Sequence, residues 1–185
     1  MLSRIQVLRG VAAYMVVIFH TVEFLASNTD LAIPQAAIGA AGVDIFFVIS
    51  GFIMIHVTRE SETPARFALA RIARIVPLYW IATIGAVLAA IVAPWSFVNA
   101  RIDPEALLMS IAFIPTTDAR GAFEPILFVG WTLNFEMAFY AIFACSLFFS
   151  KKYQLLALAA GLLVLFIIGR LAGQNHALGF YGNAI

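Results

Sequence analysis

The chain has 185 residues, of which 63% are hydrophobic and only 11% charged, with a net charge of +1. A typical soluble domain carries roughly 25% charged residues, so this composition excludes an ordinary soluble protein and indicates an integral membrane protein. The few basic residues lie between apolar runs and form no stripe, which argues against nucleic-acid binding. A single cysteine excludes an intrachain disulfide.

Five segments are apolar over the length of about 20 residues that a transmembrane helix needs. They cover residues 7–26, 36–57, 75–93, 125–149 and 155–171. The apolar run in residues 104–114 is too short to cross a bilayer and predicts an interfacial or re-entrant helix. Residues 66–74, R-F-A-L-A-R-I-A-R, predict an amphipathic surface helix that leads into the third span. With no repeat or linker, the predicted fold is one all-α, polytopic membrane helix bundle over residues 1–185.

Loop charges predict the orientation of these spans, because short cytoplasmic loops are enriched in Lys and Arg. The N-terminus, the second loop and the fourth loop are basic, whereas the first loop holds Asp30 and the third holds Asp103, Glu105, Asp118 and Glu124. We therefore expect five spans with the N-terminus in the cytoplasm.

Polar side chains interrupt the first two predicted spans. Arg9 and His20 are eleven residues apart, which is almost three helical turns, so they share a face about 16 Å apart along the axis. Asp44 lies within the second span. A charged side chain near the bilayer centre costs on the order of 3 kcal/mol, so these residues predict a polar functional site between helices.

The arginine pair before the third span and the histidine of the first span each have a possible chemical role and a simpler structural one. Arg71 and Arg74 present two guanidinium groups on one helix face, which suits a phosphate-bearing donor, but such arginines also anchor spans at the membrane surface. His20 has the one side chain here whose ordinary pKa is near neutrality, so it suits a general base or an acyl carrier. The alternative for His20 is packing between helices.

Four sequence blocks together resemble the acyltransferase 3 family of membrane O-acyltransferases, in the group that modifies surface polysaccharides. The first block is Arg9, ten residues and His20. The others are G-V-D-I-F-F-V-I-S-G-F from residue 42, R-I-A-R-I-V-P-L-Y-W from residue 71 and W-T-L-N-F-E-M from residue 131. They occur in the family's order and cover residues 3–140.

The resemblance implies transfer of an acyl group, expected to be acetyl, from cytoplasmic acyl-coenzyme A to a hydroxyl of a surface or exported glycan or lipid-linked sugar. It assigns catalysis to His20, with Arg9 as the second essential group of that motif. Arg71 and Arg74 would contact the phosphates of the coenzyme. It implies no metal, and it places the protein in the bacterial cytoplasmic membrane.

The remaining motif residues have two interpretations each. A carboxylate from Asp44 or Glu136 would orient His20, or Asp44 would only neutralise Arg9. Small residues in the second block would permit close helix packing, and the tryptophan of the fourth would anchor the interface. These motif residues are Ser50, Gly51, Phe52 and Trp131.

The resemblance also implies that the chain corresponds to the N-terminal half of a family member, truncated at its C-terminus. Two other functions fit the polar residues. One is a transporter or channel half-module in which Arg9, His20 and Asp44 form an intramembrane pathway. The other is a structural subunit in which they join helices.

Overall fold

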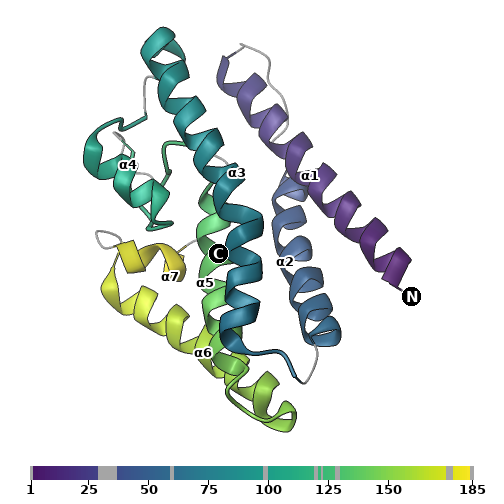
Figure 1. Cartoon of the computed structure of the whole chain (residues 1–185). Coiled ribbons are helices and arrows are strands. Elements are labelled where there is room, and N and C mark those ends of the chain that lie inside the picture. Colours follow the sequence, from purple (N-terminus) through teal and green to yellow (C-terminus); the bar gives the residue numbers. More distant parts are fainter. Residues whose placement is uncertain are drawn as a thin grey trace. The chain divides into compact units, whose positions relative to one another are not determined.

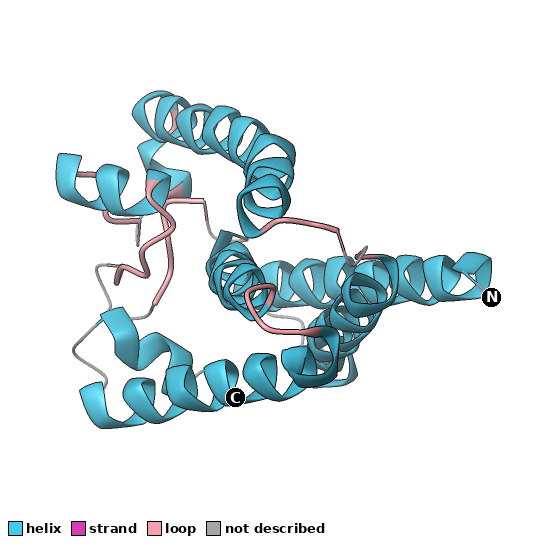
Figure 2. Cartoon of the chain, turned by 60° about the horizontal axis from the view of Figure 1, so that its bottom comes forward, coloured by secondary structure: helices cyan, strands magenta, loops and turns pink. Residues whose placement is uncertain are grey.

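A computed structural model describes the chain at residues 2–28, 37–58, 61–97, 100–118, 121, 123–127, 130–173 and 177–183. Every regular element in these ranges is a helix, as predicted (Figure 2). Within them, the side chains of residues 2–4, 20, 23–28, 37–41, 43, 44, 96 and 183 lie outside the description. The residues divide into two compact units, Met1–Arg59 and Glu60–Ile185.

The first unit is a pair of helices, α1 (Leu2–Asn28) and α2 (Ala37–Val57). They contain the first two predicted spans. Gly42 is buried where the helices meet, and a Cβ there would lie 2.9 Å from both the Ala12 carbonyl oxygen and Met15 Cβ. The helices approach this closely because Gly42 has no side chain.

The second unit begins with α3 (Pro64–Val92), a single helix of 29 residues. Thr63 caps it by accepting a hydrogen bond from the Arg66 amide at 3.3 Å, and Pro64 occupies the first turn, where no amide hydrogen is needed. Residues 66–74, predicted as an amphipathic helix leading into the third span, are helical and form the first part of α3 itself. Pro77 lies inside α3 without ending it, so the arginine-rich segment continues directly into the apolar one.

After α3 come a short helix, η1 (Pro94–Ser96), and then α4 (Pro104–Ile111) and α5 (Trp131–Ser146). The end of α4 is fixed beside the middle of α3, where Trp80 Nε1 donates to the Ile111 carbonyl oxygen at 3.1 Å. Phe113 then adopts φ +56°, a conformation rare for a non-glycine residue, which ends the helix before residue 114.

Helix α5 is shorter than predicted, with 16 residues in place of residues 125–149. It runs antiparallel to α3: Gly130 at its start lies against Tyr79, whereas Phe143 near its end packs on Phe67 with ring centroids 4.8 Å apart. The described apolar residues before Trp131 form a non-helical segment instead. Helices α4 and α5 thus pack along two successive parts of α3 (Figure 1).

The unit ends with α6 (Lys151–Ala172), followed by η3 (Ala177–Gly179) and α7 (Phe180–Asn183). A Cβ on Gly169 would collide with the Gly182 amide nitrogen, so α7 folds back into direct backbone contact with α6. The predicted span over residues 155–171 lies within α6.

Among the described residues, α3 and α6 are long and apolar enough to cross a membrane. Large apolar side chains on both remain exposed, including Leu78 at 71% and Leu171 at 82%. In water such a surface is unfavourable, so these helices are consistent with a membrane protein. The described apolar stretches of α1 and α2, Ile5–Phe19 and Ile45–Val57, are shorter, and the five-span arrangement stays a prediction.

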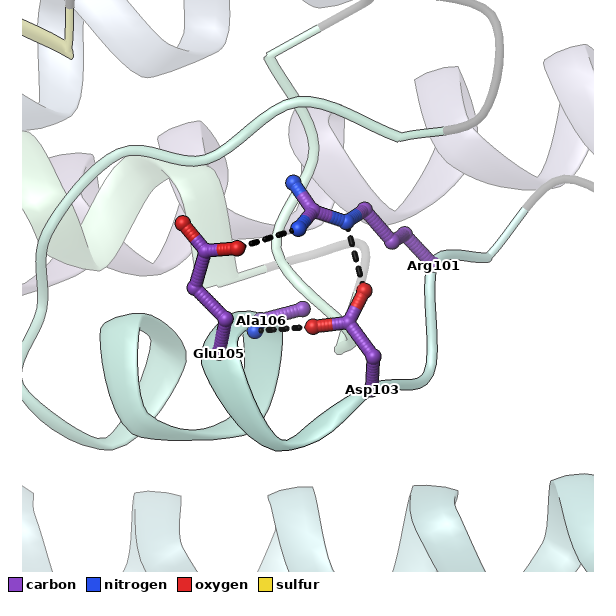
Figure 3. A network of polar contacts seen from close by, with 4 residues as sticks. All are labelled: Arg101, Asp103, Glu105 and Ala106. Carbon is purple, nitrogen blue, oxygen red and sulfur yellow. Dashed lines mark hydrogen bonds and ion pairs between the residues drawn. The ribbon is translucent and has the colours of Figure 1, made fainter.

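A polar network fixes the start of α4 (Figure 3). Asp103 Oδ1 accepts a hydrogen bond from the Ala106 amide at 2.8 Å, and Arg101 bridges Asp103 Oδ2 at 2.5 Å and Glu105 Oε2 at 2.6 Å. The Ala106 amide, and next the Arg101 guanidinium, lower the pKa of the Asp103 carboxyl. This exposed cluster is satisfied by its own members.

Candidate active site

Arg9 lies on α1 with its guanidinium over the Phe46 ring of α2, 5.2 Å from the ring centroid. Its Nε is buried and has no hydrogen-bond partner among the described atoms. A guanidinium on an aromatic face is attracted electrostatically, but the contact leaves its hydrogen-bond donors unused. Arg9 is therefore held in place by stacking, with donor capacity left for another group.

The backbone register of α1 and α2 places Asp44 nearer in height to Arg9 than to His20. Gly42 faces Ala12 and its neighbours on α1, so residue 44 falls near the height of Ala12. His20 lies about 12 Å farther along the axis of α1. The side chains of His20 and Asp44 lie outside the described part of the structure. The backbone register favours the interpretation in which Asp44 neutralises Arg9.

The rest of the second block lies on the later turns of α2. The Ser50 hydroxyl oxygen is buried and makes no hydrogen bond with the described residues. Gly51 is half-buried. The Phe52 ring is partly exposed and stacks on the His56 ring at 4.6 Å. Of these residues, Ser50 alone carries an unused polar atom.

Arg71 of the second unit is held against two aromatic rings. Its guanidinium lies over the rings of Phe67, one turn earlier on α3, and of Tyr140 on α5, at 5.0 and 5.5 Å from the ring centroids. Its Nε is buried without a hydrogen-bond partner in the described residues. Among the described side chains, neither Arg71 nor the exposed Arg74 makes an ion pair. Two such guanidinium groups at one end of α3 are suited to bind an anion.

Glu136 is connected to Arg71 through Tyr140, which contacts both residues. The Tyr140 hydroxyl donates a hydrogen bond to Glu136 Oε1, one turn earlier on α5. The positive charges of Arg71 and Arg74 act on the same hydroxyl. The fold thus brings together Arg71, Arg74 and Glu136, three residues predicted from two distant blocks.

Sequence reasoning missed Tyr140 and Phe67, which join the predicted residues into one cluster. Each lies four residues from a predicted site residue, Tyr140 from Glu136 and Phe67 from Arg71. That spacing places side chains on the same helix face, and it is the signal that finds them. Trp131 instead begins α5 and packs edge-on against Phe135, with ring centroids 6.2 Å apart. The predicted site residues divide between the units, with Arg9, His20, Asp44, Ser50, Gly51 and Phe52 in the first and Arg71, Arg74, Trp131 and Glu136 in the second.

Comparison with known proteins gives the relationships of the chain. The sequence profile of the acyltransferase domain matches residues 2–185. The exopolysaccharide production protein ExoZ of Rhizobium meliloti (strain 1021) is 46% identical over 142 residues, which are 76% of this chain and 44% of ExoZ. Protein 2 in the picA locus of Rhizobium radiobacter is 30% identical over 158 residues, covering 74% of this chain and 78% of that protein. No solved structure matches.

The chain spans less than half the length of ExoZ. The profile match, by contrast, extends over nearly every residue of the chain and includes all four sequence blocks. The chain belongs to the acyltransferase 3 family.

Proposed function

We propose that this chain is part of a membrane O-acyltransferase that moves an acyl group, expected to be acetyl, from cytoplasmic acyl-coenzyme A to a hydroxyl of a surface or exported polysaccharide. Family membership supports the reaction class. The similarity to ExoZ, an exopolysaccharide production protein, supports a polysaccharide acceptor. The acceptor is a glycan or a lipid-linked sugar.

The main support for this proposal is that Arg71 lies against two rings and keeps a buried donor nitrogen without a partner in the described residues. Its guanidinium is stacked on Phe67 and Tyr140, and its buried Nε is satisfied by no described atom, which is costly to maintain without an anion. The phosphates of acyl-coenzyme A supply that anion. Arg74, one turn away and exposed, provides a second guanidinium for the same polyanionic group.

In this proposal the residues of the Arg-x10-His motif act on the acceptor hydroxyl. His20 takes the proton of the acceptor hydroxyl, or carries the acyl group transiently, and Arg9 is the second essential group of the motif. Asp44 neutralises Arg9, in agreement with the register of α1 and α2. Glu136, held by Tyr140, is the carboxylate beside the arginines that bind the donor.

The proposal includes an arrangement in the membrane. Five spans with the N-terminus in the cytoplasm place Arg9, Arg71 and Arg74 near the inner face and His20 toward the outer half. The protein would then lie in the bacterial cytoplasmic membrane, with its donor inside and its acceptor outside. The long apolar helices α3 and α6 support membrane insertion.

The first experiment measures binding of labelled acetyl-coenzyme A by the chain in lipid vesicles. Replacing Arg71 and Arg74 with alanine removes charge-assisted hydrogen bonds, so the affinity should fall by about tenfold to a hundredfold. Arg66→Ala is the matched control, because Arg66 is on the same helix, is 83% exposed and is 3.8 Å from Glu62. Equal losses in the control and the double variant would contradict a specific phosphate site.

The second experiment follows the label into polysaccharide in membranes that contain the chain. The wild-type chain should transfer label, and His20→Ala should bind acetyl-coenzyme A but transfer none. Transfer by His20→Ala would contradict the catalytic assignment. A wild-type chain that binds no acetyl-coenzyme A would contradict the proposed function itself.

A further inference from the structure

The break between α4 and α5 places a helix N-terminus beside the middle of α3. Helix α5 begins at Trp131, no described side chain caps it, and Gly130 before it also has a helical conformation, with φ −72° and ψ −12°. A Cβ on Gly130 would lie 3.1 Å from the Tyr79 hydroxyl oxygen and 2.8 Å from Tyr79 Cε2. The Tyr79 hydroxyl therefore lies directly against the first turn of α5.

The Tyr79 hydroxyl is buried without a partner in the described part of the chain. Tyr79 is 3% exposed, and its hydroxyl makes no hydrogen bond with any described atom. The hydroxyls of Thr83 and Ser110 are its polar neighbours, but neither bonds it with acceptable geometry. Ser110 Oγ instead accepts a hydrogen bond from the Ile126 amide at 3.2 Å. An unused buried hydroxyl is unfavourable unless a ligand takes it.

Both features favour the same kind of ligand atom. The N-terminal turn of a helix carries a partial positive charge. A tyrosine hydroxyl is a hydrogen-bond donor. Together they favour an oxygen that carries, or gains, negative charge, and burial strengthens the interaction by excluding water.

We propose that Tyr79 and the N-terminus of α5 bind the acyl carbonyl oxygen of the donor thioester. This inference rests on the proposed function and names the part of the donor that the site takes. It makes Tyr79 a catalytic residue, in the sense that its hydroxyl touches the reacting group.

The chemistry of the transfer explains why such a site accelerates it. When the acceptor oxygen adds to the carbonyl carbon, the C=O π electrons move onto the carbonyl oxygen, which becomes negative. When the intermediate collapses, these electrons re-form the C=O bond, and the C–S bond breaks with its electron pair on sulfur. The acceptor's proton passes to the base and then to the coenzyme thiolate. The positive helix end and the Tyr79 hydroxyl stabilise the oxygen while it is negative.

The position of Tyr79 on α3 agrees with an elongated donor. Phe67, Arg71, Ile75, Tyr79 and Thr83 follow one another at four-residue intervals, and all of them are buried or half-buried. Arg71 and Tyr79 are about 12 Å apart along the helix axis. Arg71 meets α5 at the Tyr140 ring and Tyr79 meets it at Gly130, so this helix pair presents a cationic group for the phosphates and, farther along, a hydroxyl for the acyl end.

The kinetic test uses Tyr79→Phe, which removes one hydroxyl and keeps the ring that stacks on Phe113 at 4.6 Å. We expect kcat for transfer to fall by about a hundredfold, while the Kd for acetyl-coenzyme A rises by no more than about tenfold, the effect of one lost hydrogen bond. Tyr153→Phe, at an exposed position on α6, is the matched control and should leave kcat unchanged. Wild-type kcat in Tyr79→Phe would overturn the inference, as would a loss of kcat accompanied by equal loss of binding and thermal stability.

A spectroscopic test needs no turnover. In the complex with acetyl-coenzyme A carrying a 13C-labelled carbonyl, a hydrogen bond to that oxygen lowers the C=O stretching frequency. The frequency should rise toward the free value in Tyr79→Phe and in Gly130→Ala, whose added methyl displaces the Tyr79 hydroxyl. An unshifted carbonyl in the wild-type complex overturns this inference alone, whereas absence of any complex overturns the proposed function with it.

Discussion

The hydroxyl of Tyr140 donates a hydrogen bond to Oε1 of Glu136, one turn earlier on α5. This bond holds the carboxylate of the cluster while the charges of Arg71 and Arg74 act on the same hydroxyl. Among the described residues, Glu136 makes no ion pair with either arginine. Tyr140 thus keeps opposite charges near one another without neutralising the cations.

Tyr140→Phe should weaken donor binding without removing a cation. The phenylalanine ring still supports Arg71, but Glu136 loses its donor and becomes able to pair with the arginines. We expect the Kd for acetyl-coenzyme A in vesicles to rise about tenfold, which corresponds to one hydrogen-bond-sized change in free energy. Adding Glu136→Gln to this variant should return the Kd to near the wild-type value. If the double variant binds as weakly as Tyr140→Phe, competition by Glu136 is not the cause.

Arg71→Lys should give an affinity between those of the wild type and Arg71→Ala. Lysine keeps the positive charge but lacks the planar fork that stacks on Phe67 and Tyr140 and bonds two phosphate oxygens at once. Equilibrium binding of labelled acetyl-coenzyme A measures the effect, with Arg66→Lys as the control. Wild-type affinity in Arg71→Lys would show that charge alone is sufficient.

Gly42→Ala should destabilise the first unit. The new methyl would lie 2.9 Å from the Ala12 carbonyl oxygen and from Met15 Cβ, so α1 and α2 must move apart. Overpacking of this kind lowers the free energy of unfolding by about 1 to 3 kcal/mol. Gly10→Ala, on α1 with nothing within 4 Å, is the control and should be neutral or stabilising, because alanine favours a helix over glycine by about 1 kcal/mol. Thermal unfolding in detergent compares the two variants.

Acidification should weaken the N-cap of α4, because protonation of Asp103 weakens its hydrogen bond with the Ala106 amide. The pKa of this carboxyl is lowered in the folded chain from an ordinary value of 3.8. A lowered pKa means that the ionised form is preferred on folding, so its contribution is complete above about pH 3.8 and disappears as the pH falls through the folded-state pKa. Hydrogen exchange at the Ala106 amide should accelerate over that acidic range. The control is Asp103→Asn, which keeps a capping oxygen but does not titrate, so exchange in this variant should lack the pH dependence.

The helices were predictable from sequence to different degrees. The bounds of α2 follow closely from a long apolar run with breaks at both ends, and so does the end of α6, although α6 begins at Lys151, four residues before the predicted start. The start of α5 did not follow, because apolar content alone does not distinguish helix from the buried non-helical segment that precedes Trp131. The continuity of α3 was also missed, since the change from polar to apolar composition at Arg74 resembles a boundary although the backbone hydrogen bonding continues through it.

The sequence predicted which residues form the candidate site better than it predicted the contacts between them. The four sequence blocks identified Arg71, Arg74 and Glu136 before any contact was known. The roles of Tyr140 and Tyr79 depend on what their hydroxyls meet where α3 and α5 pack together. These contacts depend on which residues of α3 lie opposite which residues of α5. The pattern of apolar residues along one helix does not specify that alignment.

The division of α4 from α5 also has a consequence for biogenesis. With eight and sixteen residues, both are shorter than the segment of about 20 residues that inserts as an independent span. The described backbone between them at residues 114–118 and 123–127 is non-helical, and such backbone tolerates a lipid environment only when protein surrounds it. We therefore expect α3, which contacts both and is synthesised first, to provide the surface on which the two shorter helices fold.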